Sequence, residues 1–299
     1  MLLDMASDLV IEASGLRKSY KATLALDGVD LQMARGEVLS LLGPNGAGKT
    51  TTIEILEGYR RRDAGEARVL GEDPQRAGPA WRAKRGIVLQ SCEDVVDLTV
   101  AECVDHFAQF YPDPARSEDV IAKVGLSAKS GARIRSLSGG QRRRLDVALG
   151  IIGRPELLFL DEPTTGFDPQ ARRQFWEVVR DLAREGTSIL LTTHYLDEAE
   201  ALADRVVVIN RGRVVANGAP ADLGGRQSAA AVVSWAGPNG PERERTDRPT
   251  ALVRSLEERF GGEVPGLTVT RPTLEDIYLR LIGEVGGAAD EAGMPEGAR

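Results

Sequence analysis

The sequence predicts an α/β fold built around a largely parallel β-sheet. Short, continuous apolar runs recur at residues 38–43, 157–162 and 188–194, and each is bounded by residues typical of turns. Amphipathic segments with helical spacing lie between these runs, for example at residues 172–185. Apolar strands that alternate with helices are typical of a parallel sheet covered by helices. We expect the runs to form buried strands, and residues 205–218 to form a β-hairpin about the turn NRGR.

The composition of the chain narrows the classes of function. The 299 residues carry 38 basic and 45 acidic side chains, a formal net charge of -7. Because a nucleic-acid-binding domain usually presents a basic surface, this balance disfavours a nucleic-acid partner. We expect no secretory signal at the N-terminus, and no apolar run approaches the ~20 residues that span a bilayer. Any crossing of a membrane must therefore be made by another chain.

The character of the sequence changes after about residue 224. Apolar residues no longer recur with a regular spacing there, and glycine, proline and charged residues accumulate. Helical patterns follow at residues 249–261 and 273–283, with a strand pattern between them at residues 266–272. The sequence therefore predicts a large domain over residues 1–224, a small α+β accessory domain over residues 225–283 and a disordered tail over residues 284–299.

A phosphate-binding pattern lies at residues 43–50. The segment GPNGAGKT fits G-x-x-x-x-G-K-[ST], follows an apolar strand and precedes an amphipathic helix, which disfavours a chance glycine loop. Backbone N–H groups of such a loop turn inward toward an anion, and the helix N-terminus adds partial positive charge. Lys49 supplies a full charge to the outer phosphates, and the Thr50 hydroxyl is placed to bind Mg²⁺. The expected nucleotide-binding residues here are Gly43, Pro44, Asn45, Gly46, Ala47, Gly48, Lys49, Thr50 and Thr51.

Two consecutive carboxylates end the apolar run at residues 157–160. A phosphate-binding loop of this type needs a second, metal-directed carboxylate at the end of a buried strand, and Asp161 stands at that position. Glu162 follows immediately, where it can polarise an attacking water. The alternative is a pair of solvated acids that merely end a strand. The neighbouring phosphate-binding pattern favours the catalytic interpretation.

Taken in order along the chain, these motifs resemble the nucleotide-binding subunit of ATP-binding cassette (ABC) transporters. The resemblance covers about residues 10–220, and LSGGQ at residues 137–141 matches the signature of that family. It implies a P-loop ABC-type nucleotide-binding domain with a RecA-like core, an antiparallel β subdomain and an α-helical subdomain at about residues 91–135. It also implies ATP hydrolysis, with ATP and Mg²⁺ as ligands.

The resemblance assigns roles to further residues. Tyr20 matches the aromatic residue on which adenine stacks, and Gln90 matches the glutamine that reaches the metal and the water and senses the membrane partner. Asp168 matches the loop that crosses to the other subunit, and His194 matches the histidine that contacts the γ-phosphate. The expected catalytic residues are therefore Glu162, His194 and Gln90. The expected metal ligands are Thr50, Gln90 and Asp161.

The signature segment is expected to start a helix. A hydroxyl and free N–H groups at a helix start can face a γ-phosphate, and the resemblance implies that this phosphate belongs to a second subunit. The residues concerned are Ser138, Gly139, Gly140 and Gln141. Leu145, Leu149 and Ile152 share one helix face and should dock the helix on the core. We expect Arg142 to pair with Asp146 at the surface, so that the arginine run is a solvated face and no DNA-binding helix.

The C-terminal unit narrows the choice within the family. RPTLEDIYLRLIG at residues 271–283 and the segment around the signature resemble ATPases of the daunorubicin/doxorubicin-exporter type. This implies an exporter of a drug, lipid or other hydrophobic compound, in which the ATPase pairs with a separate polytopic membrane permease subunit. With one phosphate-binding loop and one signature, the chain should form a homodimer, or half of a heterodimer, that is cytoplasmic and peripheral on the inner face of the cell membrane.

Two other classes of ABC protein remain open. One is a soluble ATPase in translation or DNA maintenance, which is disfavoured because the chain has a single cassette and neither coiled-coil heptads nor zinc-like cysteine pairs. The other is the ATPase of an importer, which shares the same motifs and is disfavoured only by the C-terminal unit.

Overall fold

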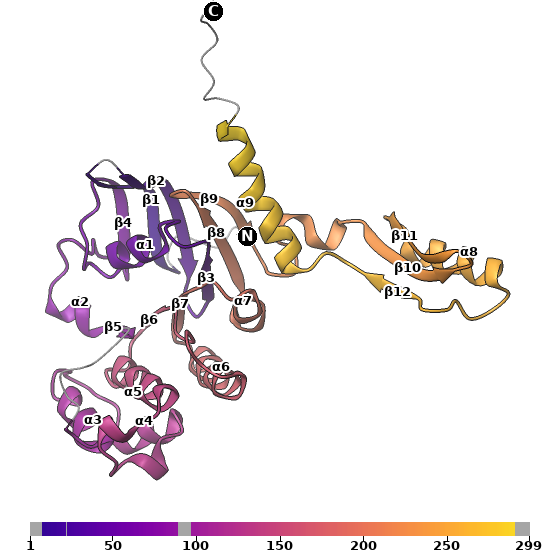
Figure 1. Cartoon of the computed structure of the whole chain (residues 1–299). Helices are drawn as coiled ribbons and strands as arrows, with labels where there is room; N and C mark the ends of the chain where they lie inside the picture. Colours follow the sequence, from indigo (N-terminus) through magenta and orange to yellow (C-terminus); the bar gives the residue numbers. More distant parts are fainter. Residues whose placement is uncertain (1–7, 22, 89–96, 291–299) are drawn as a thin grey trace, which may run out of the picture. The chain divides into compact units, whose positions relative to one another are not determined.

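The computed structural model describes residues 8–21, 23–88 and 97–290 (Figure 1). The chain divides into two compact units, Met1–Asn217 and Gly218–Arg299. The first unit contains a six-stranded sheet, a three-stranded sheet and a set of helices. The predicted α/β class is confirmed.

The six-stranded sheet holds the buried strands that the sequence predicts. Its strands, in spatial order, are β5 (Arg85–Val88), β6 (Leu157–Asp161), β7 (Ser188–Thr193), β3 (Val38–Leu42), β8 (Arg205–Asn210) and β9 (Arg213–Gly218). The pairs from β5 through β8 are parallel. Strands β8 and β9 are joined by Arg211 and Gly212, both with positive φ, as a two-residue hairpin turn requires.

The N-terminal part of the first unit forms a three-stranded antiparallel sheet. It consists of β1 (Leu9–Tyr20), β2 (Thr23–Ala34) and β4 (Ala64–Val69) in the order β2-β1-β4. Its buried side chains form one cluster with the helix α1 (Lys49–Leu56) and with strands β3 and β6. The short helix α2 (Pro79–Ala83) closes this cluster through buried Trp81, whose Nε1 donates to the Val69 carbonyl at 2.7 Å.

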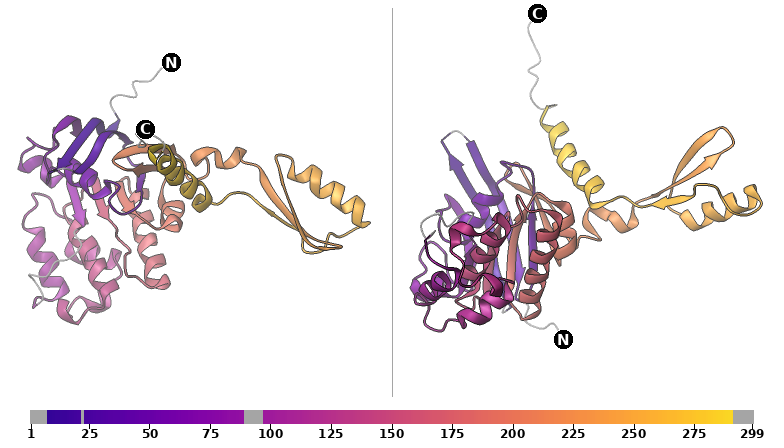
Figure 2. Two further views of the ribbon diagram at one scale, coloured as in Figure 1. Left: turned by 45° about the horizontal axis from the view of Figure 1, so that its top comes forward. Right: turned by 60° about the horizontal axis from the view of Figure 1, so that its bottom comes forward.

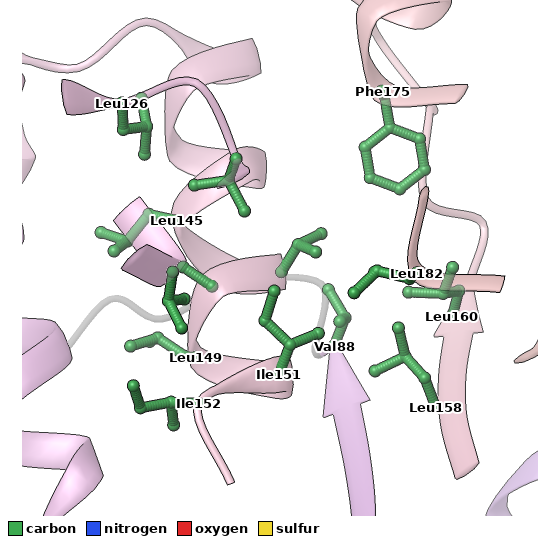
Figure 3. Close-up of a cluster of buried hydrophobic side chains, with 14 of the residues drawn as sticks. Val88, Leu126, Leu145, Leu149, Ile151, Ile152, Leu158, Leu160, Phe175 and Leu182 are labelled. Atoms are coloured by element: carbon green, nitrogen blue, oxygen red, sulfur yellow. The ribbon is translucent and has the colours of Figure 1, made fainter. Parts of the chain in front are cut away.

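The first unit also contains helices between residues 100 and 202. They are α3 (Val100–Ala108), α4 (Ser117–Lys123), α5 (Gly139–Ile151), α6 (Pro169–Arg184) and α7 (Leu196–Leu202). As predicted, Leu145, Leu149 and Ile152 are buried in a cluster that joins α5 to its neighbours (Figure 3). Ile151 lies in the same cluster with Val88 of β5, so α5 is fixed both to the helices and to the sheet.

Helix α5 and strand β5 approach each other without intervening side chains. A Cβ atom on Gly86 would lie 2.1 Å from the Gly150 carbonyl oxygen, and one on Gly150 would lie 2.9 Å from Val88 Cγ2. Both distances are shorter than a non-bonded contact. At Gly86 the backbone of β5 therefore lies against the backbone of α5 and only glycine fits, whereas a methyl group on Gly150 would meet the side chains of Val88 and Leu158.

The second unit is a small α+β unit (Figure 2). Its sheet has the order β11-β10-β12, from β10 (Ala231–Gly237), β11 (Gly240–Thr246) and β12 (Thr268–Thr270). Helix α8 (Pro249–Phe260) contributes Leu256 to a small core with Val233, Trp235 and Val264. Helix α9 (Leu274–Asp290) packs through Ile277 on the 3-10 turn Leu223–Ser228, and it continues past residue 284, where we predict that the tail begins.

The hairpin β10–β11 is absent from the sequence-based prediction, which finds no strong periodicity after residue 224. Strand β10 alternates buried and partly exposed residues, but β11 (GPERERT) has no buried residue. A strand that is exposed on both faces carries no hydrophobic alternation, so its sequence resembles a loop. Over the described part of the chain, no helix combines the length and the apolar character needed to cross a bilayer.

The contact between Gly86 and Gly150 predicts a sensitive position. Gly86→Ala places a methyl group against the backbone of α5, and we expect a loss of about 3 kcal/mol in the free energy of unfolding. Gly131→Ala is the control, because a Cβ atom there would meet no other group within 4 Å and its φ is not positive. Urea denaturation of both variants checks this, and equal stabilities would contradict the packing described.

Candidate functional site

The loop at residues 43–48 joins buried strand β3 to helix α1. Gly48 is the residue before the helix and has a φ of 109°, in the region that favours glycine. A Cβ atom there would also lie 2.8 Å from the Ala25 carbonyl oxygen, so the loop lies tightly against β2. Its backbone turns at the open N-terminus of α1, where unpaired N–H groups and the helix dipole favour an anion.

Lys49 is the buried cation of this loop. Its side chain is 5% exposed, and its Nζ donates to the carbonyls of Gly43 at 2.8 Å and Pro44 at 3.3 Å. The same Nζ lies 3.9 Å from Glu162 Oε1. Burial lowers the pKa of Lys49, and the charges of Glu162 and Asp161 oppose that shift. A phosphate in the loop would give this ammonium group a charged acceptor, which binds more strongly than neutral carbonyls.

Asp161 and Glu162 lie at the carboxyl end of β6, beside the end of β7. The Thr192 hydroxyl donates to Asp161 Oδ1, and the Glu162 N–H lies 3.0 Å from Thr192 Oγ1 and 3.2 Å from the Thr192 carbonyl oxygen. His194 follows β7, and its Nδ1 lies 3.6 Å from Glu162 Oε1. The structure thus brings Lys49, Asp161, Glu162 and His194 together, as the motifs predict.

A cavity of about 630 Å³ lies beside Asp161, the one residue of this group that lines it. Thr50 and Asp161 both line it, and their hydroxyl and carboxylate oxygens are ligands that suit Mg²⁺. Glu57 and Arg85 line the same cavity, and burial raises the pKa of Glu57 to about 7 although Arg85 opposes the shift. Gln90, the third predicted metal ligand, lies outside the described residues.

Tyr20 ends strand β1 close to the start of α1. Its hydroxyl lies 3.5 Å from Thr51 Oγ1, and the residue is 37% exposed. The Arg60 guanidinium lies 5.1 Å from the ring centroid, within the range of a cation–π contact. The aromatic ring thus lies next to the helix that follows the phosphate-binding loop, with a cation against it.

The signature segment starts helix α5 as the sequence predicts. Ser138 is the N-cap residue: its Oγ accepts from the Gln141 N–H at 3.3 Å, and its own N–H donates to Gln141 Oε1 at 3.1 Å. Gly139 and Gly140 form the first turn of the helix. Asp168 caps α6 in a similar way and accepts from the N–H groups of Gln170 and Ala171.

The signature segment is not joined to the cluster around Glu162 by polar contacts. Among the residues that the structure describes, no hydrogen bond or ion pair links Ser138 to Lys49, Asp161 or His194. The capping bonds of Ser138 lie within its own helix. The structure therefore does not bring these two predicted halves of the nucleotide site together through such bonds within one chain.

The arginine run that follows the signature differs from the prediction. Arg142 does not form the expected surface pair with Asp146: its Nη2 lies 3.5 Å from the Ile134 carbonyl, a long contact. The pair is formed by Arg143, whose Nη1 lies 3.8 Å from Asp146 Oδ2, and both side chains are buried. Burial raises the pKa of Asp146 to about 6, and the positive charge of Arg143 opposes this shift. The interpretation of the whole run as a solvated face is therefore wrong.

Two residues that contact the predicted site were given no role from the sequence. Thr192 holds Asp161 and Glu162 through its hydroxyl and carbonyl, and Arg143 donates to the Asp161 carbonyl at 3.0 Å. The threonine does have a sequence signal, since a polar residue in an apolar strand two positions before His194 must find a hydrogen-bond partner. Arg143 stands between two other arginines, and spacing alone does not distinguish them.

Comparisons with known proteins agree with this arrangement. Residues 26–165 match the family model described as ABC transporter. The chain is 37% identical over 308 residues to daunorubicin resistance ATP-binding protein DrrA3 of Streptomyces coeruleorubidus, covering 93% of this chain and 97% of that protein. It is 38% identical over 306 residues to Nod factor export ATP-binding protein I of Ralstonia nicotianae, covering 93% of this chain and 95% of that protein.

A solved structure shows the same fold. An ATP-binding subunit of an ABC transporter superposes with a TM-score of 0.68 at 23% identity, covering 91% of this chain and 99% of that chain. The sequence relatives are similar over almost their full length, and the family model includes both the phosphate-binding loop and the signature. The chain therefore belongs to the ABC transporter family, as one of its ATP-binding subunits.

Proposed function

We propose that the chain is the ATP-hydrolysing subunit of an exporter that moves a drug, lipid or other hydrophobic compound through a separate membrane subunit. Membership of the family makes the chain an ATPase. Export is supported by the similarity to daunorubicin resistance and Nod factor export proteins over more than nine-tenths of the chain. One observation carries the proposal: Lys49, Asp161, Glu162 and His194 lie together at the carboxyl ends of neighbouring strands.

In this proposal, the loop at residues 43–51 holds the phosphates of ATP. Its N–H groups and the Lys49 ammonium would bind the phosphate oxygens, and adenine would stack on the exposed ring of Tyr20. The Thr50 hydroxyl and the Asp161 carboxylate would hold Mg²⁺, with Gln90 as a further ligand. Bound Mg²⁺ neutralises charge on the outer phosphates.

Glu162 is the proposed general base for hydrolysis. Its carboxylate oxygen lies within 4 Å of both Lys49 Nζ and His194 Nδ1, so it stands between a phosphate-binding cation and a second polar group. From there it can accept a proton from a water that attacks the γ-phosphate. His194 would contact the γ-phosphate and complete the polar wall of the site.

We propose that the signature segment completes the site of a second subunit. The chain has one phosphate-binding loop and one signature, and within the described residues Ser138 makes no polar bond to the cluster around Glu162. Ser138, Gly139, Gly140 and Gln141 would then bind the ATP held by the partner's loop, with Asp168 at the crossing between subunits. Two copies arranged in this way form an isologous dimer, and a related partner would form a heterodimer.

The membrane is the proposed site of action. The chain would lie peripherally on the cytoplasmic, inner face of the cell membrane and bind a polytopic permease subunit. Its net charge of -7 supports a protein partner over nucleic acid. The compound that is exported would be selected by the permease, because in this arrangement the path of the substrate belongs to the membrane subunit.

Glu162→Gln tests the assignment of the base. The amide keeps the size of the side chain but cannot accept the proton, so we expect ATP to bind and hydrolysis to fall by about 100-fold or more. An ATP-bound dimer should accumulate on size-exclusion chromatography. Lys49→Ala is the contrasting variant, since it removes the main counter-charge and should lose most ATP binding. A normal rate of phosphate release from Glu162→Gln would refute this role.

Thr192→Val tests how the two carboxylates are held. The substitution keeps the shape of the side chain but removes the hydroxyl that bonds to Asp161 and Glu162, so we expect hydrolysis to fall about tenfold or more. ATP affinity should change less than about threefold, because within the described part of the chain the Thr192 hydroxyl bonds to Asp161 and Glu162 and not to the phosphate-binding loop. Ser188→Ala is the matched control: it removes a hydroxyl that bonds to the Gly36 N–H at the other end of β7. Equal rates for the two variants would contradict the role of Thr192.

Isolation of membranes tests the exporter assignment. The tagged chain, expressed in its native cells, should remain with gently solubilised membranes and co-purify with a polytopic protein. Mass spectrometry of the retained material identifies that protein. Recovery of the chain wholly in the soluble fraction with ribosomes or DNA would refute the exporter assignment, while the assignment as an ATPase would stand.

A further inference from the structure

Arg143 is a buried cation on the second turn of helix α5. Its side chain is 9% exposed and lies against the end of strand β6. Nε donates to the Pro163 carbonyl at 3.0 Å, and Nη2 donates to the Asp161 carbonyl at 3.0 Å. One planar guanidinium therefore binds the two main-chain carbonyls that stand immediately before and after Glu162. The two bonds come from different nitrogens of the guanidinium, which holds its donors in one rigid plane.

The backbone that Arg143 holds has an uncommon conformation. Glu162 has a φ of 44°, a region that residues other than glycine rarely occupy. Such a conformation persists only when surrounding bonds determine it. On one side the Glu162 N–H contacts Thr192, and on the other the two flanking carbonyls are fixed by Arg143. The direction in which the Glu162 carboxylate leaves the chain depends on both sets of bonds.

Asp146 supplies the charge that Arg143 needs. It lies one turn further along α5, 6% exposed, with Oδ2 at 3.8 Å from Arg143 Nη1. A buried guanidinium without a counter-charge is unfavourable, so the two residues act as a pair. The pair sits on the helix that begins at the signature residue Ser138, five positions before Arg143 in the sequence.

We propose that Arg143 is a positioning residue for hydrolysis, which orients Glu162 through the carbonyls of Asp161 and Pro163. The proposal rests on the role given above to Glu162 as the general base. Arg143 need not touch ATP or water. It links the helix that carries the signature to the carboxyl end of β6 in the same chain. A displacement of that helix would therefore change the position of the backbone on either side of Glu162.

Arg143→Met removes both carbonyl bonds while keeping the length of the side chain. We expect the kcat of ATP hydrolysis to fall about tenfold or more, with the KM for ATP and the affinity for ATP within about twofold of the unchanged protein. Arg144→Met is the matched control on the same helix, since the Arg144 guanidinium donates to Gln174 on α6 and not to the turn at Glu162. A normal kcat for Arg143→Met would overturn the proposal.

A second variant separates positioning from stability. Arg143→Met leaves the Asp146 carboxylate buried without its partner, which itself destabilises the fold. The double variant Arg143→Met/Asp146→Asn removes both charges, and its unfolding midpoint should return toward that of the unchanged protein. Its kcat should stay about tenfold or more below normal. Recovery of kcat together with stability would show that the pair is only structural and would overturn the proposal.

Glu162→Gln, assayed in parallel, distinguishes the two levels of inference. If Glu162→Gln hydrolyses ATP at the normal rate, the base is another group, and the proposed function fails at that point. If Glu162→Gln is inactive and both Arg143 variants turn over normally, only the positioning role of Arg143 fails.

Discussion

The parallel register of β6, β7 and β3 is the constraint on which the site depends. In that register Asp161 pairs with Thr192, and Leu42, the last residue of β3, pairs with Thr193. The phosphate-binding loop, the carboxylate pair and His194 therefore leave the sheet at one edge. Because side chains alternate faces along a strand, a slip of one residue would turn Asp161 away from Thr192. Because nearly all residues of the three strands are buried, close packing of their side chains against both neighbouring layers sets this register.

The two buried cations near the site, Lys49 and Arg143, both donate hydrogen bonds to main-chain carbonyls. Lys49 donates to the carbonyls of Gly43 and Pro44, and Arg143 donates to the carbonyls of Asp161 and Pro163. In both cases the acceptors lie at the carboxyl end of a buried strand or directly after it. Each buried charge thereby satisfies its hydrogen-bonding groups and fixes the backbone of a turn that carries function. The same hydrogen bonds that offset the electrostatic cost of burying these cations therefore also fix the backbone of the site.

Sequence patterns could predict the parts of the molecule in which a local signal determines the structure. The strands at β3, β6 and β7 and the helix start at Ser138 follow from apolar runs and a capping residue, and they are confirmed. The partner of Asp146 could not be predicted, because spacings of three and four residues both place arginines on the same helix face. Which arginine is buried is decided by α5 packing on β6, a tertiary contact. Strand β11 lacks a buried face altogether, so no pattern in its sequence distinguishes it from a loop.

The backbone contact between Gly86 and Gly150 joins strand β5 directly to helix α5. Side chains between two elements can change rotamer and absorb a small displacement, but two backbones in contact have no such compliance. At this crossing, a displacement of α5 toward the sheet would bring its backbone against that of β5. Strand β5 ends at Val88, two positions before Gln90, the residue that the family resemblance relates to the membrane partner. Helix α5 therefore begins at the signature segment and, near its other end, lies directly against the strand that precedes Gln90 in the sequence.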